Sequence, residues 1–110
     1  MAENRDESRK EGEGKASPRR LPQPRARFSA EHRALLSILV EARQAAGLSQ
    51  AALAEKLGKV QSHVAYIETN ERDITVVETY RWCEATQLPF GEFARLLDER
   101  IRALKMQASD

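Results

Sequence analysis

Residues 47–68, GLSQAALAEKLGKVQSHVAYIE, contain two short segments of helical periodicity separated by a tight turn. Ser49 is a residue type that caps the start of a helix, and Gly58 is the residue type best suited to end one. We therefore predict one helix over 50–57. The start of a second helix has no such mark, and Val64 and Ile67, at a spacing of three, predict it over 61–69. Helices this short are not stable alone in water, so they must be held by packing against each other and against neighbours.

The apolar residues of this stretch indicate how the two helices pack. Leu53 and Leu57 share one face of the first helix, and Val64 and Ile67 share one face of the second. The connection between them is three residues long and begins with glycine. This pattern is typical of a helix-turn-helix, in which the second helix enters the major groove of DNA with its amino end first.

Each helix of the pair opens with a glutamine. In a helix-turn-helix, Gln50 at the start of the first helix is placed to donate to a backbone phosphate beside the helix dipole. Gln61 at the start of the second helix is placed to pair with N6 and N7 of adenine in the groove. The sequence therefore predicts one glutamine that positions the protein and one that reads a base.

Three further helices are predicted around this pair. Ser29 begins a helix that Gly47 ends, and Thr75 forms a T-x-x-E capping box for a helix that continues to about Thr86. After Pro89, an apolar stripe predicts a last helix over about 91–106. No run of residues alternates as a strand would, so the predicted fold is all-α, with five helices and a disordered N-terminal arm.

Charge is unevenly distributed along the chain. Residues 1–14 have a net charge of −2, residues 15–27 a net charge of +5, and residues 28–110 a net charge of −2. Residues 1–27 have few large apolar side chains and three prolines among the bases, which predicts a disordered, extended arm. This arm is interpreted either as a solubilising tail or as a segment that follows a polyanion. The helix-turn-helix domain is expected over 28–106, with a short tail at 107–110.

Composition argues against several classes of protein. No run of eighteen apolar residues could span a membrane, and the N-terminus has no apolar signal region. Cys83 is the only cysteine, which fits a reducing compartment, and a buried structural thiol is favoured over a nucleophile. His32 has no second ligand at metal spacing. We expect a cytoplasmic protein that is not an enzyme and has no metal or cofactor.

With these features in place, residues 36–97 resemble the Cro and repressor type of helix-turn-helix domain, often called the XRE family. The resemblance is carried by EARQAAGLSQAALAEKLG, VQSHVAYIETNER and ITVVETYRWCEATQLPFGEFARLL. It implies a five-helix domain, usually dimeric, that binds operator DNA and usually represses transcription.

The resemblance also implies roles for individual residues. The base-contacting positions of the recognition helix correspond to Gln61, Ser62, His63, Ala65 and Tyr66. The phosphate-contacting positions correspond to Arg43, Gln50, Lys59, Thr69, Asn70 and Arg72. Tyr66 could instead pack beneath the helix, and His63 is expected to be exposed to solvent in the unbound protein.

Two positions depart from the family pattern. Many relatives have Asn-Gly after the Ile-Glu pair, where this chain has Thr69-Asn70. Asparagine is the next-best residue for positive φ, so the turn is expected to form. Glu71 stands where the family has a basic residue, and a carboxylate there would repel phosphate.

The sequence leaves two alternatives open, one for the last helix and one for the function. Leu97, Ile101 and Leu104 form a stripe that either packs on the core or makes a homodimer contact, with the dimer slightly favoured. A dimer would bind a palindromic site on double-stranded DNA. The alternative function is an antitoxin-like or adaptor module whose main role is to bind another protein.

Overall fold

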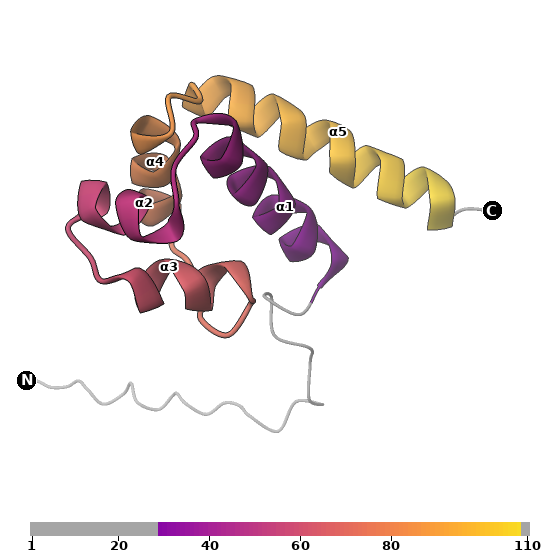
Figure 1. The fold of residues 1–110 in the computed structure, drawn as a ribbon. Coiled ribbons are helices and arrows are strands. Elements are labelled where there is room, and N and C mark those ends of the chain that lie inside the picture. Colours follow the sequence, from indigo (N-terminus) through magenta and orange to yellow (C-terminus); the bar gives the residue numbers. More distant parts are fainter. Residues whose placement is uncertain (1–28, 109–110) are drawn as a thin grey trace, which may run out of the picture.

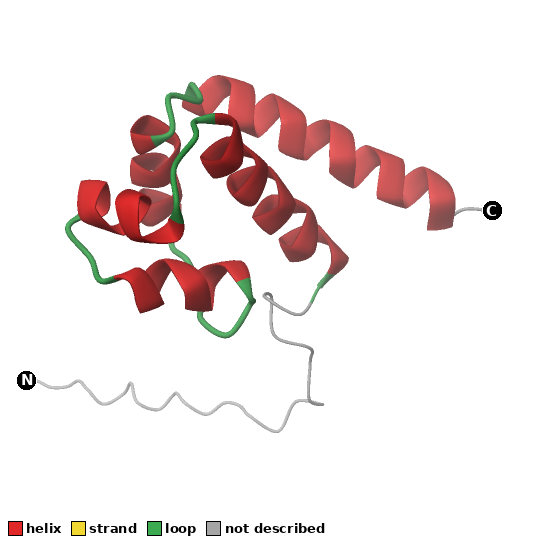
Figure 2. Cartoon of the chain, in the orientation of Figure 1, coloured by secondary structure: helices red, strands yellow, loops and turns green. Residues whose placement is uncertain are grey.

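The computed structural model of the chain describes residues 29–108, which form five helices and no strand (Figures 1 and 2). The helices are α1 (Ala30–Ala45), α2 (Gln50–Leu57), α3 (Gln61–Glu68), α4 (Val76–Ala85) and α5 (Phe90–Ala108). The all-α prediction is confirmed. The predicted arm at 1–27 lies outside the described residues. The last helix begins one residue earlier and ends two residues later than predicted, so residues 107 and 108 belong to α5 rather than to a tail.

The predicted helix starts are confirmed at three caps. The side-chain oxygens of Ser29 and Ser49 accept from the backbone N–H of His32 and Ala52, each at 3.0 Å. Thr75 forms the full capping box: its Oγ1 accepts from Glu78 N at 3.0 Å, and its own N–H donates to the Glu78 carboxylate at 2.8 Å. Because these bonds satisfy backbone donors that have no partner inside the helix, each start is determined locally.

Four of the helices are followed, within two residues of their last position, by a residue with left-handed backbone geometry. Gly47 and Gly58 have φ values of 74° and 70°, as their residue type predicts. Asn70 has φ 66°, which confirms that the turn after α3 survives without the family's glycine. Gln87 after α4 also has positive φ, at 62°, and no sequence signal marked it.

The core lies between all five helices. Its largest fully buried side chains are Trp82, Ile38, Leu39, Leu53, Ile67, Val64 and Cys83. The indole Nε1 of Trp82 donates to the backbone carbonyl of Leu39 at 3.0 Å, so its single polar atom is satisfied inside the core. Burial raises the pKa of Cys83 to about 11, which agrees with a structural thiol rather than a nucleophile.

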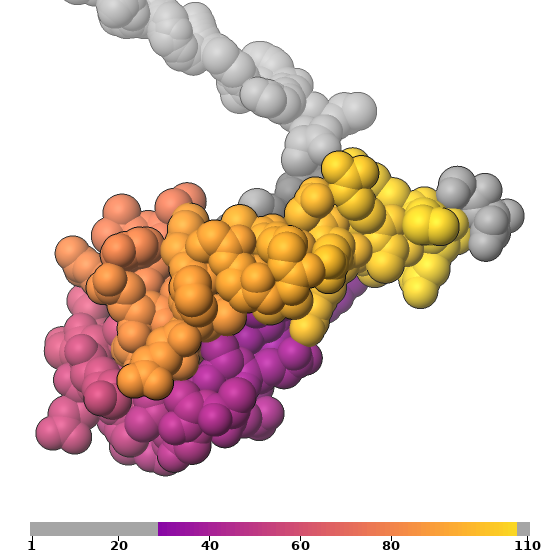
Figure 3. Space-filling model, turned by 90° about the horizontal axis from the view of Figure 1, so that it is seen from above, coloured from indigo at the N-terminus to yellow at the C-terminus, as the bar shows by residue number. Residues whose placement is uncertain are grey.

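Helix α5 lies across α1 and closes the bundle (Figure 3). Arg100 on α5 donates to Ser37 Oγ and to the Glu41 carboxylate on α1, both at 2.7 Å. The C-terminal end of α5 extends past the other helices (Figure 1). None of the helices formed by residues 29–108 combines the length and apolar character needed to cross a membrane.

Candidate nucleic-acid interface

The two short helices α2 and α3 pack against each other through small and branched apolar side chains. Leu53 and Ala54 of α2 and Val64 and Ile67 of α3 are at most 1% exposed. The turn between the helices is Gly58–Lys59–Val60, and the left-handed geometry of Gly58 reverses the chain without a side-chain penalty. The predicted core positions Leu53, Val64 and Ile67 are therefore confirmed as buried, while Leu57 is half-buried against the core.

A chain of side-chain hydrogen bonds runs along the pair and into α1. The Gln61 amide donates to Gln50 Oε1 at 2.7 Å, and the Gln50 amide donates to Glu68 Oε1 at 2.8 Å. Glu68 also accepts from Arg43, from Nε at 2.6 Å and from the second terminal nitrogen at 3.1 Å. Because each amide is oriented by its neighbour, the side chain that opens α3 is held in place from α1 and α2 together.

The exposed arc of α3 contains four of the five residues predicted to meet bases. At 3.6 residues per turn, positions 61, 62, 65 and 66 span about 140° of the helix surface. Gln61 is exposed, and Ser62 and Ala65 are half-buried. Tyr66 is 51% exposed, so it lies on the open surface and not beneath the helix. We call these four residues the groove-facing arc of α3.

The fifth residue, His63, is not exposed as the sequence suggested. Its side chain is only 11% exposed and lies between α3 and α4, with Nε2 3.9 Å from Glu78 Oε2. The expectation of a solvent-exposed His63 was wrong because position 63 lies past the groove-facing arc and is covered by α4. Desolvation, with a smaller contribution from the nearby Arg72 guanidinium, lowers the pKa of His63. A role for His63 at a base stays untested.

The residues predicted to meet phosphate differ in how accessible they are. Lys59 and Thr69 are exposed, and Arg72 has a side chain 47% exposed that lies 3.7 Å from Glu78 Oε2. Arg43 has a side chain only 13% exposed and also donates to the carbonyl of Leu48 at 2.8 Å. Three of the five N–H groups of Arg43 thus donate within the protein. The main role of Arg43 is therefore to hold Glu68, which in turn orients Gln50 and Gln61.

Two glutamates that connect these residues had no predicted role in the site. Glu68 orients both Gln50 and Arg43. One carboxylate oxygen of Glu78, Oε2, lies within 4 Å of both His63 and Arg72. The signal for Glu78 was its capping box, and Glu68 was visible only as part of the family pattern. Arg43 and Glu68 are 25 residues apart, and His63 and Glu78 lie on different helices, so no local pattern in the sequence indicated either role.

The predicted dimer stripe on α5 is partly covered. Leu97 packs against the core, and Ile101 and Leu104 are half-buried. Charged residues beside this stripe form ion pairs along the helix surface, with Arg95 bonded to Glu92 and Glu99 and Arg102 bonded to Asp98. The stripe therefore does not form an open apolar surface, and its role in a dimer stays a prediction.

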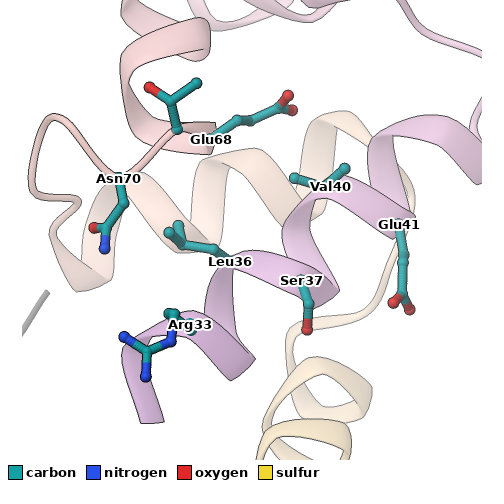
Figure 4. Close-up of a pocket in the computed structure, with 8 residues that line it drawn as sticks. Arg33, Leu36, Ser37, Val40, Glu41, Glu68 and Asn70 are labelled. Carbon is teal, nitrogen blue, oxygen red and sulfur yellow. The ribbon is translucent and has the colours of Figure 1, made fainter. Parts of the chain in front are cut away.

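A groove of about 490 Å³ lies between α1 and the end of α3 (Figure 4). Its lining residues are Arg33, Leu36, Ser37, Val40, Glu41, Glu68, Thr69 and Asn70. Its two carboxylates are already paired, Glu41 with Arg100 and Glu68 with Arg43. Within the part of the chain that the structure describes, no three His, Cys, Asp or Glu side chains lie close enough to hold a metal ion.

A bundle of five helices with an exposed polar arc on the second helix of a helix-turn-helix defines a DNA-binding class of protein. A family model described as helix-turn-helix matches residues 39–93. The solved structure of an XRE-family like protein from Pseudomonas syringae pv. tomato str. DC3000 is similar, with 37% sequence identity and a TM-score of 0.62. The match covers 64% of this chain and 87% of that one. A search of curated proteins found no match.

This chain therefore belongs to the XRE family of helix-turn-helix proteins, which are DNA-binding transcription regulators. The resemblance inferred from its sequence is confirmed. Members of this family are typically not enzymes.

Proposed function

We propose that the protein is a sequence-specific repressor that binds a palindromic operator as a dimer. The observation that supports this best is the fixed orientation of Gln61. A base-reading side chain must be held rigidly to discriminate, and Gln61 is connected through Gln50 and Glu68 to Arg43.

The hydrogen-bond chain also determines which way each amide faces. The carboxylate of Glu68 is paired with Arg43 and only accepts, so Gln50 must present its NH₂ group to Glu68 and its oxygen to Gln61. Gln61 then uses one N–H on Gln50 and keeps its oxygen and its other N–H for a ligand. An oxygen that accepts from N6 and an N–H that donates to N7 are what adenine requires in the major groove.

Residues around α3 supply the contacts that would position the domain on DNA. Lys59 precedes α3, and Thr69 and Arg72 follow it, so all three lie at its two ends. Residues 43–72 carry a net charge of +1 within a body of −2, which predicts modest affinity. The basic segment 15–27 would add phosphate contacts, each raising the salt slope of binding by about 0.9.

A two-fold dimer would present two α3 helices to successive turns of one face of the duplex, about 34–36 Å apart. The site read by such a dimer is a palindrome with half-sites one helical turn apart. A protein seated there would exclude other proteins from the same DNA, which is the physical basis for proposing repression.

Selection from a random duplex pool at physiological salt tests this function. The full chain should enrich a two-fold symmetric motif that contains adenine at equivalent positions of both half-sites. Gln61→Ala should lose preference at that position, whereas Gln107→Ala, at an exposed glutamine on α5, should enrich the wild-type motif. If the wild-type protein enriches no motif and its DNA binding disappears with added salt, sequence-specific recognition is excluded.

A further inference from the structure

Helix α4 has an exposed apolar face at its amino end. Val76, Val77 and Tyr80 are 74%, 57% and 45% exposed. At about 100° per residue they lie within an arc of about 100°, next to the side of α4 that buries Thr79, Trp82 and Cys83. Large exposed apolar side chains of soluble monomers are normally scattered, so three in one place indicate an interaction surface.

A shallow hollow of about 510 Å³ lies next to this face, where α4 turns into α5. It is lined by Tyr80, Cys83, Glu84, Gln87, Leu88, Pro89 and Phe90. The Tyr80 and Phe90 rings are in contact, with centroids 5.6 Å apart, and Phe90 stacks on Phe93 at 5.5 Å. The same helix therefore carries a pair of projecting valines near its start and, near its end, a hollow in which aromatic and aliphatic side chains lie beside Glu84 and Gln87.

We propose that this surface binds a second copy of the chain, with the two α4 helices antiparallel around a two-fold axis beside Tyr80. The proposal rests on the proposed function, because it names the interface of the dimer. When residue 80 of one copy is opposite residue 81 of the other, Val77 and Val76 lie opposite residues 84 and 85 of the partner. The projecting valines of each copy then meet the hollow of the other, as a self-complementary two-fold interface requires.

The charges on this face also suit a second copy. Arg81 and Glu84 are both exposed and carry opposite charges at neighbouring positions of α4. In the antiparallel arrangement each Arg81 lies within about one helical turn of the partner's Glu84, so the paired copies attract.

The size of the surface makes the dimer weak in the absence of DNA. The valines, Tyr80, Arg81 and the hollow amount to fewer residues than the roughly 20–30 that each partner contributes to a standard interface. Two half-sites on one duplex would raise the effective concentration of the second copy and complete the dimer. Since residues 69–75 join α3 directly to this face, the interface controls how the two α3 helices are placed.

Sedimentation equilibrium of the full chain tests the proposal, with protein concentrations up to about 0.5 mM because a weak dimer is expected. Val77→Glu places a carboxylate from each copy in the interface and should raise the dimer dissociation constant more than about tenfold. Met106→Glu makes the same kind of change at a side chain that is 72% exposed on α5, and should leave the constant unchanged. Val77 is exposed, so the variant should fold, which its helical circular dichroism would verify.

Charge reversal provides a second measurement that does not depend on burial. Arg81→Glu and Glu84→Arg should each weaken the dimer, and the double variant should recover wild-type dimerisation. A monomeric wild-type chain throughout the concentration range overturns the proposal and assigns the surface to a different protein. A dimer that Met106→Glu disrupts and Val77→Glu does not would place the interface on α5 instead.

Sedimentation detects the α4 interface independently of DNA recognition. A dimer that Val77→Glu dissociates supports the interface even if no DNA motif is ever selected. On a duplex with a single half-site, Val77→Glu should bind as well as the wild type, while on two half-sites it should bind more than about tenfold more weakly. Equal binding of both proteins to the two-half-site duplex would contradict the interface.

Discussion

Helices α2 and α3 have the same length and bury two residues each, yet their ends are built differently. α2 has a side-chain cap from Ser49 at its start and Gly58 at its end. The N-cap of α3 is Val60, which makes no side-chain cap bond and is 69% exposed, and the chain reversal after α3 uses Asn70. The two ends of α2 are thus stabilised by local capping residues, whereas the start of α3 has no such residue.

What α3 lacks in local stabilisation it receives from other elements. Gln61 is bound by Gln50 of α2, Glu68 by Arg43 of α1, and His63 lies beside Glu78 of α4. A helix held from three sides keeps its orientation, while its amino end and one face stay open. The helix proposed to read DNA therefore depends for its stability on contacts that are distant in sequence.

The largest expected effect comes from breaking the strongest of these contacts. Glu68→Ala should lower the free energy of unfolding by about 3 kcal/mol, because it leaves the largely buried Arg43 without its carboxylate. Chemical denaturation measures the change. Asp98→Ala, which removes an exposed ion pair with Arg102, should cost less than about 1 kcal/mol. Equal losses in the two variants would show that α3 does not depend on the buried pair.

A smaller effect is expected at the two chain reversals. Gly58→Ala should destabilise the protein by about 1–2 kcal/mol, since alanine is strained at φ 70°. A Cβ at this position would have no atom within 4 Å, so strain and not a clash would cause the loss. Asn70→Gly should instead be neutral or slightly stabilising. Thermal unfolding of both variants checks this contrast, and a harmless Gly58→Ala would contradict it.

Substitutions at the N-caps of α2 and α3 should change the free energy of unfolding in opposite directions. Ser49→Ala should cost about 1 kcal/mol, because it removes the acceptor for Ala52 N. Val60→Ser should stabilise the protein by about 0.5 kcal/mol, since Val60 already has the extended backbone that a capping residue needs. If Val60→Ser gives no increase in unfolding free energy, then the start of α3 is already satisfied in some other way.

The smallest effect is a dependence on pH that involves α3 and not α2. The pKa of His63 is below its ordinary value of 6.5, so the folded protein binds this proton more weakly than the unfolded chain does. The resulting stability is complete above about pH 6.5 and decreases as the pH falls below it. Lys59, Arg72, Glu78 and Arg81 lie around the ring. The pKa of Glu78 is lowered as well, so this carboxylate stays ionised in that range.

Unfolding free energies at pH 7.5 and 5.5 measure this dependence. The wild type should lose stability between the two values, and His63→Gln should lose less. An identical loss in both proteins would assign the pH dependence to other groups.

The sequence predicted those features that depend on neighbouring residues. Ser29, Ser49 and Thr75 marked three helix starts, and Gly47 and Gly58 marked two ends, because caps and left-handed turns are local. The start of α3 had no such mark and was inferred from Val64 and Ile67 alone. The burial of His63 and the pairing of Glu68 with Arg43 depend on how separate helices pack, which no local pattern encodes.

A double-mutant cycle between Gln61 and one base pair tests the central claim most directly. Binding free energies would be measured for wild type and Gln61→Ala on the selected operator and on the operator with the predicted adenine replaced. If Gln61 reads that adenine, replacing the base should cost the wild type about 1–3 kcal/mol and cost Gln61→Ala almost nothing. If both proteins lose the same amount, the oriented glutamine on α3 does not read that base.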